Sequence, residues 1–92
     1  MKAIQTQRMK YKKKSIEIEA IQWIGSNYIE ILRFFEDAQA YIQISRDNVI
    51  TIKTLERNVK AKVGSWIIKG IRGEFYSVQD GIFQETYDLI IE

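Results

Sequence analysis

The chain has 92 residues, of which 46% are hydrophobic and 28% charged, and it contains neither cysteine nor histidine. This length suits one domain with a single core. The missing residue types exclude disulfides, thiolate and histidine-based catalysis, and cysteine-ligated zinc. We therefore expect a protein without enzymatic activity, cofactor or metal site.

The distribution of apolar residues predicts neither a membrane-spanning helix nor a secretory signal. No apolar run approaches the length of a membrane helix, about eighteen residues. The charged N-terminal stretch is not followed by the apolar segment of a secretory signal. We expect a cytoplasmic protein that does not contact a membrane.

The net charge of +2 conceals an asymmetry along the chain. Residues 1–14 hold six basic residues and no acidic one, whereas the remaining residues hold eight basic and twelve acidic ones. We expect residues 1–14 to form a flexible basic arm and residues 15–92 a single α+β domain. The arm is either a solvating leader or a weak, salt-sensitive contact for nucleic acid. Met9 is a second candidate translation start.

One strand and one helix are predicted in the first part of the chain. Residues 15–23 alternate as a half-buried strand does, with Ile16 and Ile18 on the buried side. Asn27 and Glu30 have the spacing of a capping box. The apolar stripe that follows predicts a helix ending near residue 36 or 37; it consists of Tyr28, Ile31, Leu32 and Phe35.

The rest of the chain is predicted to be mostly sheet. A hairpin is expected from 41–45 and 49–54, with its turn at Arg46, Asp47 and Asn48. Further strands are expected at 59–63, 66–70 and 74–78, and the segment 82–91 should open as a helical turn and end as a strand. These elements predict an α+β fold with one main helix and a small, strongly bent antiparallel sheet or partly open barrel.

Gly70 and Gly73 raise the question of a phosphate-binding loop. Their spacing differs from that of a Walker loop or a dinucleotide fingerprint, and the residues after them favour a strand over the helix that both motifs need. We therefore interpret them as a hairpin corner in which glycine permits positive φ.

Such a corner can still carry a binding site. Cations mixed with aromatic side chains suit a flat anionic ligand. The alternative places Trp66 in the core and leaves the cations in solvent. The candidate ligand-binding residues are Trp66, Lys69, Arg72, Tyr76, Lys60 and Lys62. The most obvious carboxylate pair, Glu17 and Glu19, is interpreted as a solvated surface rather than a catalytic pair.

The chain resembles a family of small proteins encoded by phages and prophages of Gram-positive bacteria. The segments that carry the resemblance are MKYKKK (9–14), EAIQW (19–23), GSWIIKG (64–70), GEFY (73–76) and IFQETY (82–87). Ser65 and Trp66 stand where the family has Asp-Tyr. No ligand-binding residue is carried over from the family.

The resemblance implies a phage protein that acts by stoichiometric binding in the cytoplasm of the bacterial host. One hypothesis is counter-defence, in which a homo-oligomer sequesters an anionic immune nucleotide or blocks a host defence protein. A second is a structural or assembly module of the phage particle that pairs through a strand edge. A third is a nucleic-acid accessory protein that uses the basic arm.

Overall fold

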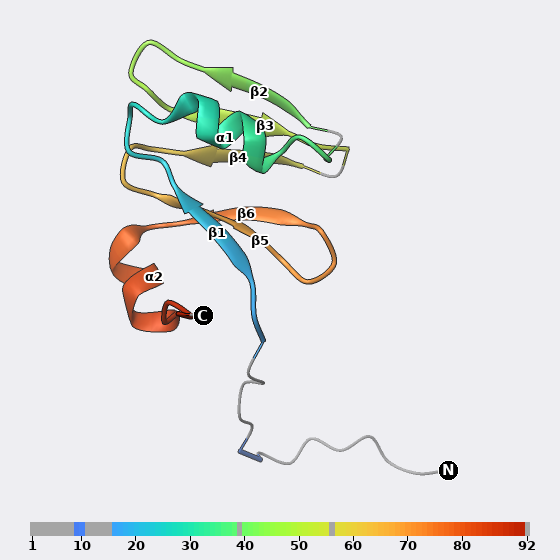
Figure 1. The fold of residues 1–92 in the computed structure, drawn as a ribbon, viewed down its shortest axis with the longest axis vertical. Helices are drawn as coiled ribbons and strands as arrows, with labels where there is room; N and C mark the ends of the chain where they lie inside the picture. The colour runs from blue at the N-terminus through green and yellow to red at the C-terminus, as the bar shows by residue number, and fades with distance from the viewer. Residues whose placement is uncertain (1–8, 11–15, 39, 56, 92) are drawn as a thin grey trace.

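The computed structural model describes residues 9–10, 16–38, 40–55 and 57–91. Its elements are β1 (Glu19–Gln22), α1 (Tyr28–Phe34), β2 (Tyr41–Ile44), β3 (Ile50–Lys53), β4 (Asn58–Ala61), β5 (Trp66–Lys69), β6 (Phe75–Val78) and α2 (Asp80–Thr86). They form two antiparallel sheets, β1–β5–β6 and β2–β3–β4, with two helices (Figure 1). The expected α+β class is confirmed. The strands divide between two sheets that are not closed into a barrel.

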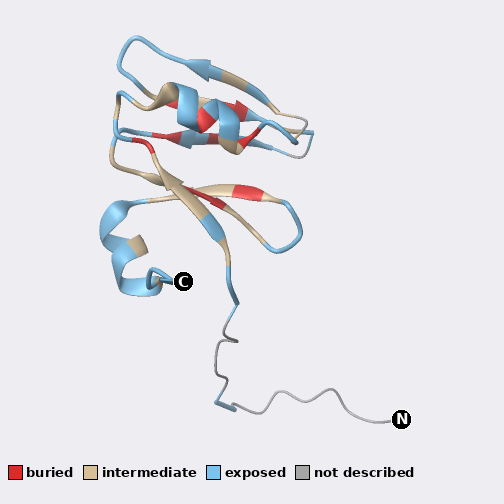
Figure 2. Cartoon of the chain, in the orientation of Figure 1, coloured by how far each residue is buried: buried red, intermediate tan, exposed pale blue. Residues whose placement is uncertain are grey.

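The core lies where α1 covers one face of the β2–β3–β4 sheet (Figures 1 and 2). Ile50 and Ile52 of β3 point to this face and are fully buried, as is Ile31 of α1. The same cluster includes Ile67 of β5 and Phe75 of β6. One hydrophobic core therefore joins both sheets, and the Oγ of Ser77 in β6 donates to the Lys60 carbonyl in β4 over 2.7 Å.

Trp23 links three segments that are far apart in the sequence. Its side chain is fully buried, and its Nε1 donates to the Asn48 carbonyl at 2.7 Å. Its backbone N–H donates to the Ser65 carbonyl, and its own carbonyl accepts from the Gly64 N–H. The strand predicted at 15–23 is present but shorter, as β1 (Glu19–Gln22), and residues 16–18 lie outside it. The predicted buried side is wrong: Ile21 packs against the core, whereas Ile16 is exposed.

The predicted capping box at the start of α1 is wrong. Asn27 makes no side-chain cap to the helix. Instead, its Oδ1 accepts from the Ile24 N–H at 3.0 Å, and its Nδ2 donates to the Gln22 carbonyl at 2.8 Å. The side chain therefore closes the loop that precedes the helix rather than the helix end. The helix itself ends at Phe34, slightly before the predicted boundary.

The hairpin predicted in the middle of the chain is confirmed. Ser45 and Val49 close it through the Ser45 N–H and the Val49 carbonyl at 3.0 Å. Asn48 adopts φ of 61°, a left-handed conformation that asparagine tolerates better than most residues. By contrast, the strand predicted at 87–91 is not formed among the described residues.

The predicted basic arm lies almost entirely outside the described residues, which include only positions 9 and 10 of it. Neither α1 nor α2, at seven residues each, has the length of a membrane-spanning segment, and no described helix qualifies as one.

We predict that Ile52→Ala lowers the free energy of unfolding by about 2–5 kcal/mol, because it removes buried methyl groups and leaves a cavity. Ile52 is fully buried, whereas Leu55 is 88% exposed. Urea denaturation should therefore show a change within about 0.5 kcal/mol for Leu55→Ala, the matched control. Equal losses in the two variants would contradict this assignment of the core.

Candidate functional site

The two glycines of the candidate site form the corner between β5 and β6. The Gly70 N–H donates to the Glu74 carbonyl at 2.7 Å, and the Gly73 N–H donates to the Gly70 carbonyl at 3.0 Å. Gly73 has φ of 82°, as predicted for a corner glycine. Gly70 does not adopt positive φ; a Cβ at that position would collide with the Glu74 carboxylate. That carboxylate accepts the Arg72 backbone N–H at 2.9 Å.

Strand alternation separates the predicted site residues on the β1–β5–β6 sheet. Trp66 and Lys69 are three apart in β5, so they point to opposite faces. Tyr76 shares the face of Trp66, because it pairs with Ile68. Arg72 lies exposed in the corner. The structure therefore does not bring Lys69 and Arg72 together with the two aromatic side chains.

Helix α2 covers the aromatic face of this sheet. The Phe83 ring stacks on Trp66 with centroids 3.9 Å apart and planes 4° apart, and Tyr87 lies 5.1 Å from Phe83. Tyr76 is hydrogen-bonded to Tyr87, and this bond together with partial burial raises the pKa of Tyr76 to about 12. The stacked face of Trp66 is therefore occupied by the chain itself and is closed to a ligand.

Asp80 anchors α2 to the sheet. Its Oδ1 accepts from Trp66 Nε1 at 2.8 Å and from Gln84 Nε2 at 3.2 Å. These two hydrogen bonds, the one from Trp66 first, lower the pKa of Asp80 below its ordinary value of 3.8. The contact is structural: it orients the indole and fixes the first turn of the helix.

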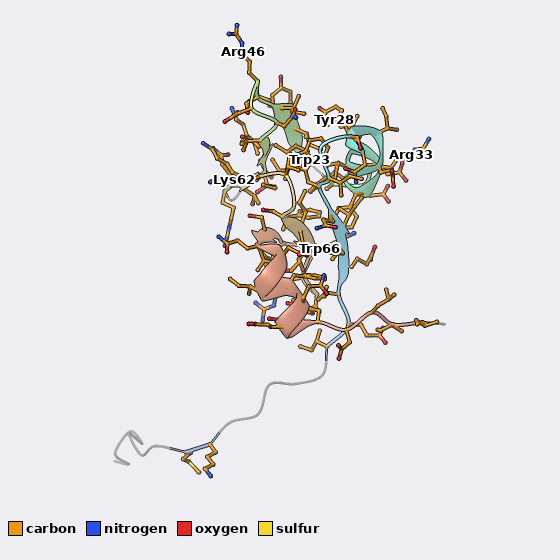
Figure 3. All side chains as sticks on the ribbon, turned by 90° about the vertical axis from the view of Figure 1, so that its left-hand side faces the viewer. Trp23, Tyr28, Arg33, Arg46, Lys62 and Trp66 are labelled. Carbon is orange, nitrogen blue, oxygen red and sulfur yellow. The ribbon has the colours of Figure 1, made fainter. Side chains whose placement is uncertain are left out.

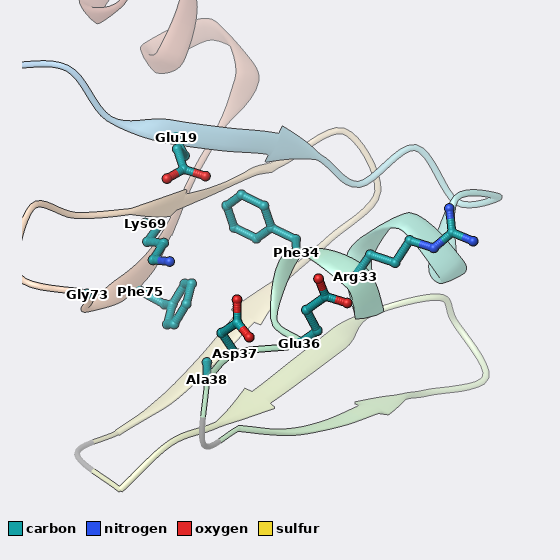
Figure 4. Close-up of a pocket in the computed structure, with 9 residues that line it drawn as sticks. All are labelled: Glu19, Arg33, Phe34, Glu36, Asp37, Ala38, Lys69, Gly73 and Phe75. Atoms are coloured by element: carbon teal, nitrogen blue, oxygen red, sulfur yellow. The ribbon is translucent and has the colours of Figure 1, made fainter.

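Lys69 lies at the other face, beside a cavity of about 430 Å³. Glu19, Asp37, Phe34 and Phe75 point toward this cavity, whereas the Arg33 guanidinium points away (Figure 4). The residues that line it are Glu19, Arg33, Phe34, Glu36, Asp37, Ala38, Lys69, Gly73 and Phe75. Three carboxylates against two cations make this cavity unfavourable for an anionic nucleotide. Among the described residues, no three Asp or Glu side chains are grouped so that they could hold a metal ion.

Lys60 and Lys62 belong to a different surface, the outward face of the β2–β3–β4 sheet. The register aligns Tyr41 with Lys53 and Asn58, and Gln43 with Thr51 and Lys60. These six residues are the ones that do not face the core, and all except Thr51 are exposed. We call them the outward sheet face. Lys62, two residues beyond Lys60, extends its row, and Figure 3 places Lys62 on the side of the molecule away from Arg33 of α1.

Charge is segregated onto this sheet. Residues 41–62 hold five basic and two acidic residues, whereas the rest of 15–92 holds three basic and ten acidic ones. The overall acidic balance of the domain thus hides one basic sheet. Asp47, in the β2–β3 turn, has its pKa lowered first by a hydrogen bond from Ser45 and further by the charges of Lys60 and Lys62.

Of the six residues of the outward sheet face, only Lys60 was predicted as a site residue; the five that were missed are Tyr41, Gln43, Thr51, Lys53 and Asn58. The signal for most of them was present in the sequence, because Ile42 and Ile44, and likewise Ile50 and Ile52, alternate with other residues along the predicted hairpin and so share its core-facing side. Alternation then requires Tyr41 and Lys53 to point outward. The stacking of Phe83 on Trp66 had no comparable signal, since it depends on how α2 folds back.

No protein-family model, curated protein or solved structure matches this chain. The resemblance to phage-encoded proteins therefore stays a prediction, as does the function attached to it.

We predict that Trp66→Phe raises the pKa of Asp80 toward 3.8, because the variant lacks the indole donor. A carboxyl group with a lowered pKa in the folded state stabilises the fold above its unfolded pKa, and this contribution disappears as the pH falls through the folded value. Carboxyl ¹³C NMR titration measures the change. Asp47 is the internal control, because its pKa depends on Ser45 in the other sheet; an unchanged Asp80 titration would contradict the anchoring role.

Proposed function

We propose that this chain is a non-enzymatic binding protein for single-stranded nucleic acid, which it holds on the outward sheet face. The observation that carries the proposal is the concentration of positive charge on one open sheet of an otherwise acidic domain. Lysines on a solvent-exposed surface attract phosphates and release their counterions. The acidic remainder of the domain repels the same ligand and so favours binding on this face.

The composition of the outward sheet face favours single strands over duplexes. Tyr41 is 63% exposed and offers a ring on which a base stacks. Gln43 and Asn58 present amide groups that both donate and accept hydrogen bonds. Lys53 and Lys60 are diagonal neighbours across β3 and β4. Diagonal neighbours in an antiparallel pair are typically about 7–8 Å apart, within reach of long side chains. An open sheet face with these groups accommodates splayed bases and a flexible nucleic-acid backbone.

Two alternatives receive less support from the geometry. The six residues predicted for nucleotide sequestration lie on separate surfaces, and the cavity beside Lys69 is lined mainly by acidic charge. Counter-defence by sequestration, and assembly into a phage particle, stay predictions of the family resemblance. A nucleotide messenger would engage lysine and tyrosine through the same chemistry, so a cyclic dinucleotide belongs among the competitors tested.

We predict that the double variant Lys53→Gln/Lys60→Gln binds a fluorescein-labelled twelve-nucleotide oligo(dT) or oligo(U) more weakly than the native chain. Fluorescence anisotropy from 50 to 200 mM salt should also show a shallower salt dependence. For a single strand, each lost phosphate contact reduces the slope of log K against log salt by about 0.7. Tyr41→Ala should weaken binding by about 1–3 kcal/mol, the value of one base–aromatic stack.

The matched control is Lys69→Gln/Arg72→Gln, which removes the same charge from the acidic part of the domain. It should leave both affinity and salt slope close to the native values. An equal loss in this control would contradict the assignment to the outward sheet face. Absence of binding at 50 mM salt would contradict the proposed function itself.

The role of the basic arm is separable from that of the sheet. Deleting residues 1–8 and then 1–14 removes two and then six basic residues. If the outward sheet face is the site, these deletions reduce the salt slope but leave the effect of Tyr41→Ala intact. If the arm alone binds, deleting residues 1–14 abolishes binding, and Tyr41→Ala has no effect in the full chain.

A further inference from the structure

The segment after α2, residues 87–91, exposes consecutive large apolar side chains. Leu89 is 86%, Ile90 54% and Ile91 87% exposed. The backbone is already extended where the segment begins, since Tyr87 has φ of −125° and ψ of 145°. Three such neighbours in water are unfavourable, unlike single apolar residues scattered over a surface. The segment has the composition and the starting conformation of a strand without a sheet to join.

The edge of β2 is an open position for an additional strand. β2 is one of the two end strands of its sheet, and an end strand presents unpaired backbone N–H and C=O groups along its outer edge. Natural edge strands are commonly protected by charged residues or proline. Of the other three end strands, β1 carries Glu19, β4 carries Lys60, and β6 is hydrogen-bonded to β4 through Ser77. Tyr41–Ile44 of β2 contains no charged residue and no proline.

The apolar layer under α1 is also incomplete at this edge. Ile50 and Ile52 of β3 are fully buried, but their partners on β2 are not. Ile42 is half-buried and Ile44 is 43% exposed. A further strand beyond β2 would cover these two side chains.

Residues 87–91 complement this edge in pattern and in charge. Leu89 and Ile91 are two apart, so in an extended chain they share one face and continue the rows of Ile42 and Ile44. Asp88 precedes the apolar run, and the β2–β3–β4 sheet that would receive it carries the basic excess. Opposite charges at a strand pair favour association.

The segment cannot reach the β2 edge of its own chain from its observed position. It leaves α2 beside the β1–β5–β6 sheet, whereas β2 lies at the far end of the molecule (Figure 1). We propose that residues 87–91 of one copy add as a fourth strand to the β2 edge of a second copy. Reciprocal addition closes a two-fold dimer. This inference is independent of the proposed function, because the outward sheet face stays open when a strand is added at its edge.

Cysteine cross-linking tests the pairing directly, since the native chain contains no cysteine. If Leu89 and Ile91 face the rows of Ile42 and Ile44, Ile90 lies opposite Gln43 whether the added strand runs parallel or antiparallel to β2. We predict that a mixture of the Gln43→Cys and Ile90→Cys variants forms a disulfide-linked heterodimer on mild oxidation, detected by non-reducing electrophoresis and mass spectrometry.

The control mixture pairs Gln43→Cys with Glu85→Cys, an exposed position on α2. It should cross-link far more slowly, because α2 stays with its own sheet. Equal cross-linking rates in the two mixtures would overturn the proposed pairing.

The oligomeric state supplies a second, independent readout. Sedimentation equilibrium of the full chain should show a dimer, with a dissociation constant that rises at least tenfold in Leu89→Ser/Ile91→Ser. Circular dichroism should show an unchanged fold, because both side chains are exposed in the single chain. Ile90→Ser is the matched control and should retain most of the affinity. A native chain that is monomeric at several hundred micromolar, or a dimer insensitive to the double substitution, would overturn the proposal.

Discussion

The indole of Trp23 is buried in the common core, and its Nε1 donates to the carbonyl of Asn48 in the β2–β3 turn. The backbone of the same residue pairs with Gly64 and Ser65, which connect β4 to β5. One residue thus ties β1 to the turn of one sheet and to the connection between both sheets. This contact and the shared core together set the relative placement of the two sheets, because each small sheet alone would leave an apolar face in water.

The two sheets differ in what covers their second face, the one that points away from the common core. In the β1–β5–β6 sheet, α2 closes the second face with aromatic contacts, and Asp80 fixes the helix to Trp66. In the β2–β3–β4 sheet, no described element covers the second face, and its side chains are polar, basic or, at Tyr41, aromatic. The surface available to a ligand is therefore the one that helix packing leaves open rather than the one with most aromatic residues.

Local periodicity predicted most of the elements but not how they combine. The hairpin of β2 and β3 followed from β-branched runs around Asp47 and Asn48, because such a pairing needs only neighbouring residues. The pairing of β1 with β5 joins Glu19 to Lys69, and no local pattern specifies a partner at that separation. The division into two sheets was unpredictable for the same reason. The capping box failed because the Asn27 side chain has two nearby backbone partners in its own loop, which the i to i+3 pattern does not reveal.

The candidate site was predictable in part from alternation alone. A spacing of three in a strand places Trp66 and Lys69 on opposite faces, so the predicted mixture of cation and aromatic ring on one surface was inconsistent with the predicted strand. The same rule correctly predicts that Lys60 and Lys62 point outward, because Val59 and Ala61 face the core. Whether an outward face is open or covered depends on tertiary packing. Only the position of α2 in the structure shows that the face with Trp66 is covered.

The open face and the open edge of the β2–β3–β4 sheet are physically compatible. A strand added beside β2 forms its hydrogen bonds in the plane of the sheet, whereas the side chains of the outward sheet face project perpendicular to that plane. Pairing through residues 87–91 would place Ile90 beside Gln43. It would widen the outward sheet face without covering Lys53 or Lys60. Two copies joined in this way would present two basic faces. A single-stranded nucleic acid that spans both faces would be held at more phosphates than one copy contacts. The effective concentration of the second face would then raise the overall affinity without any new kind of contact.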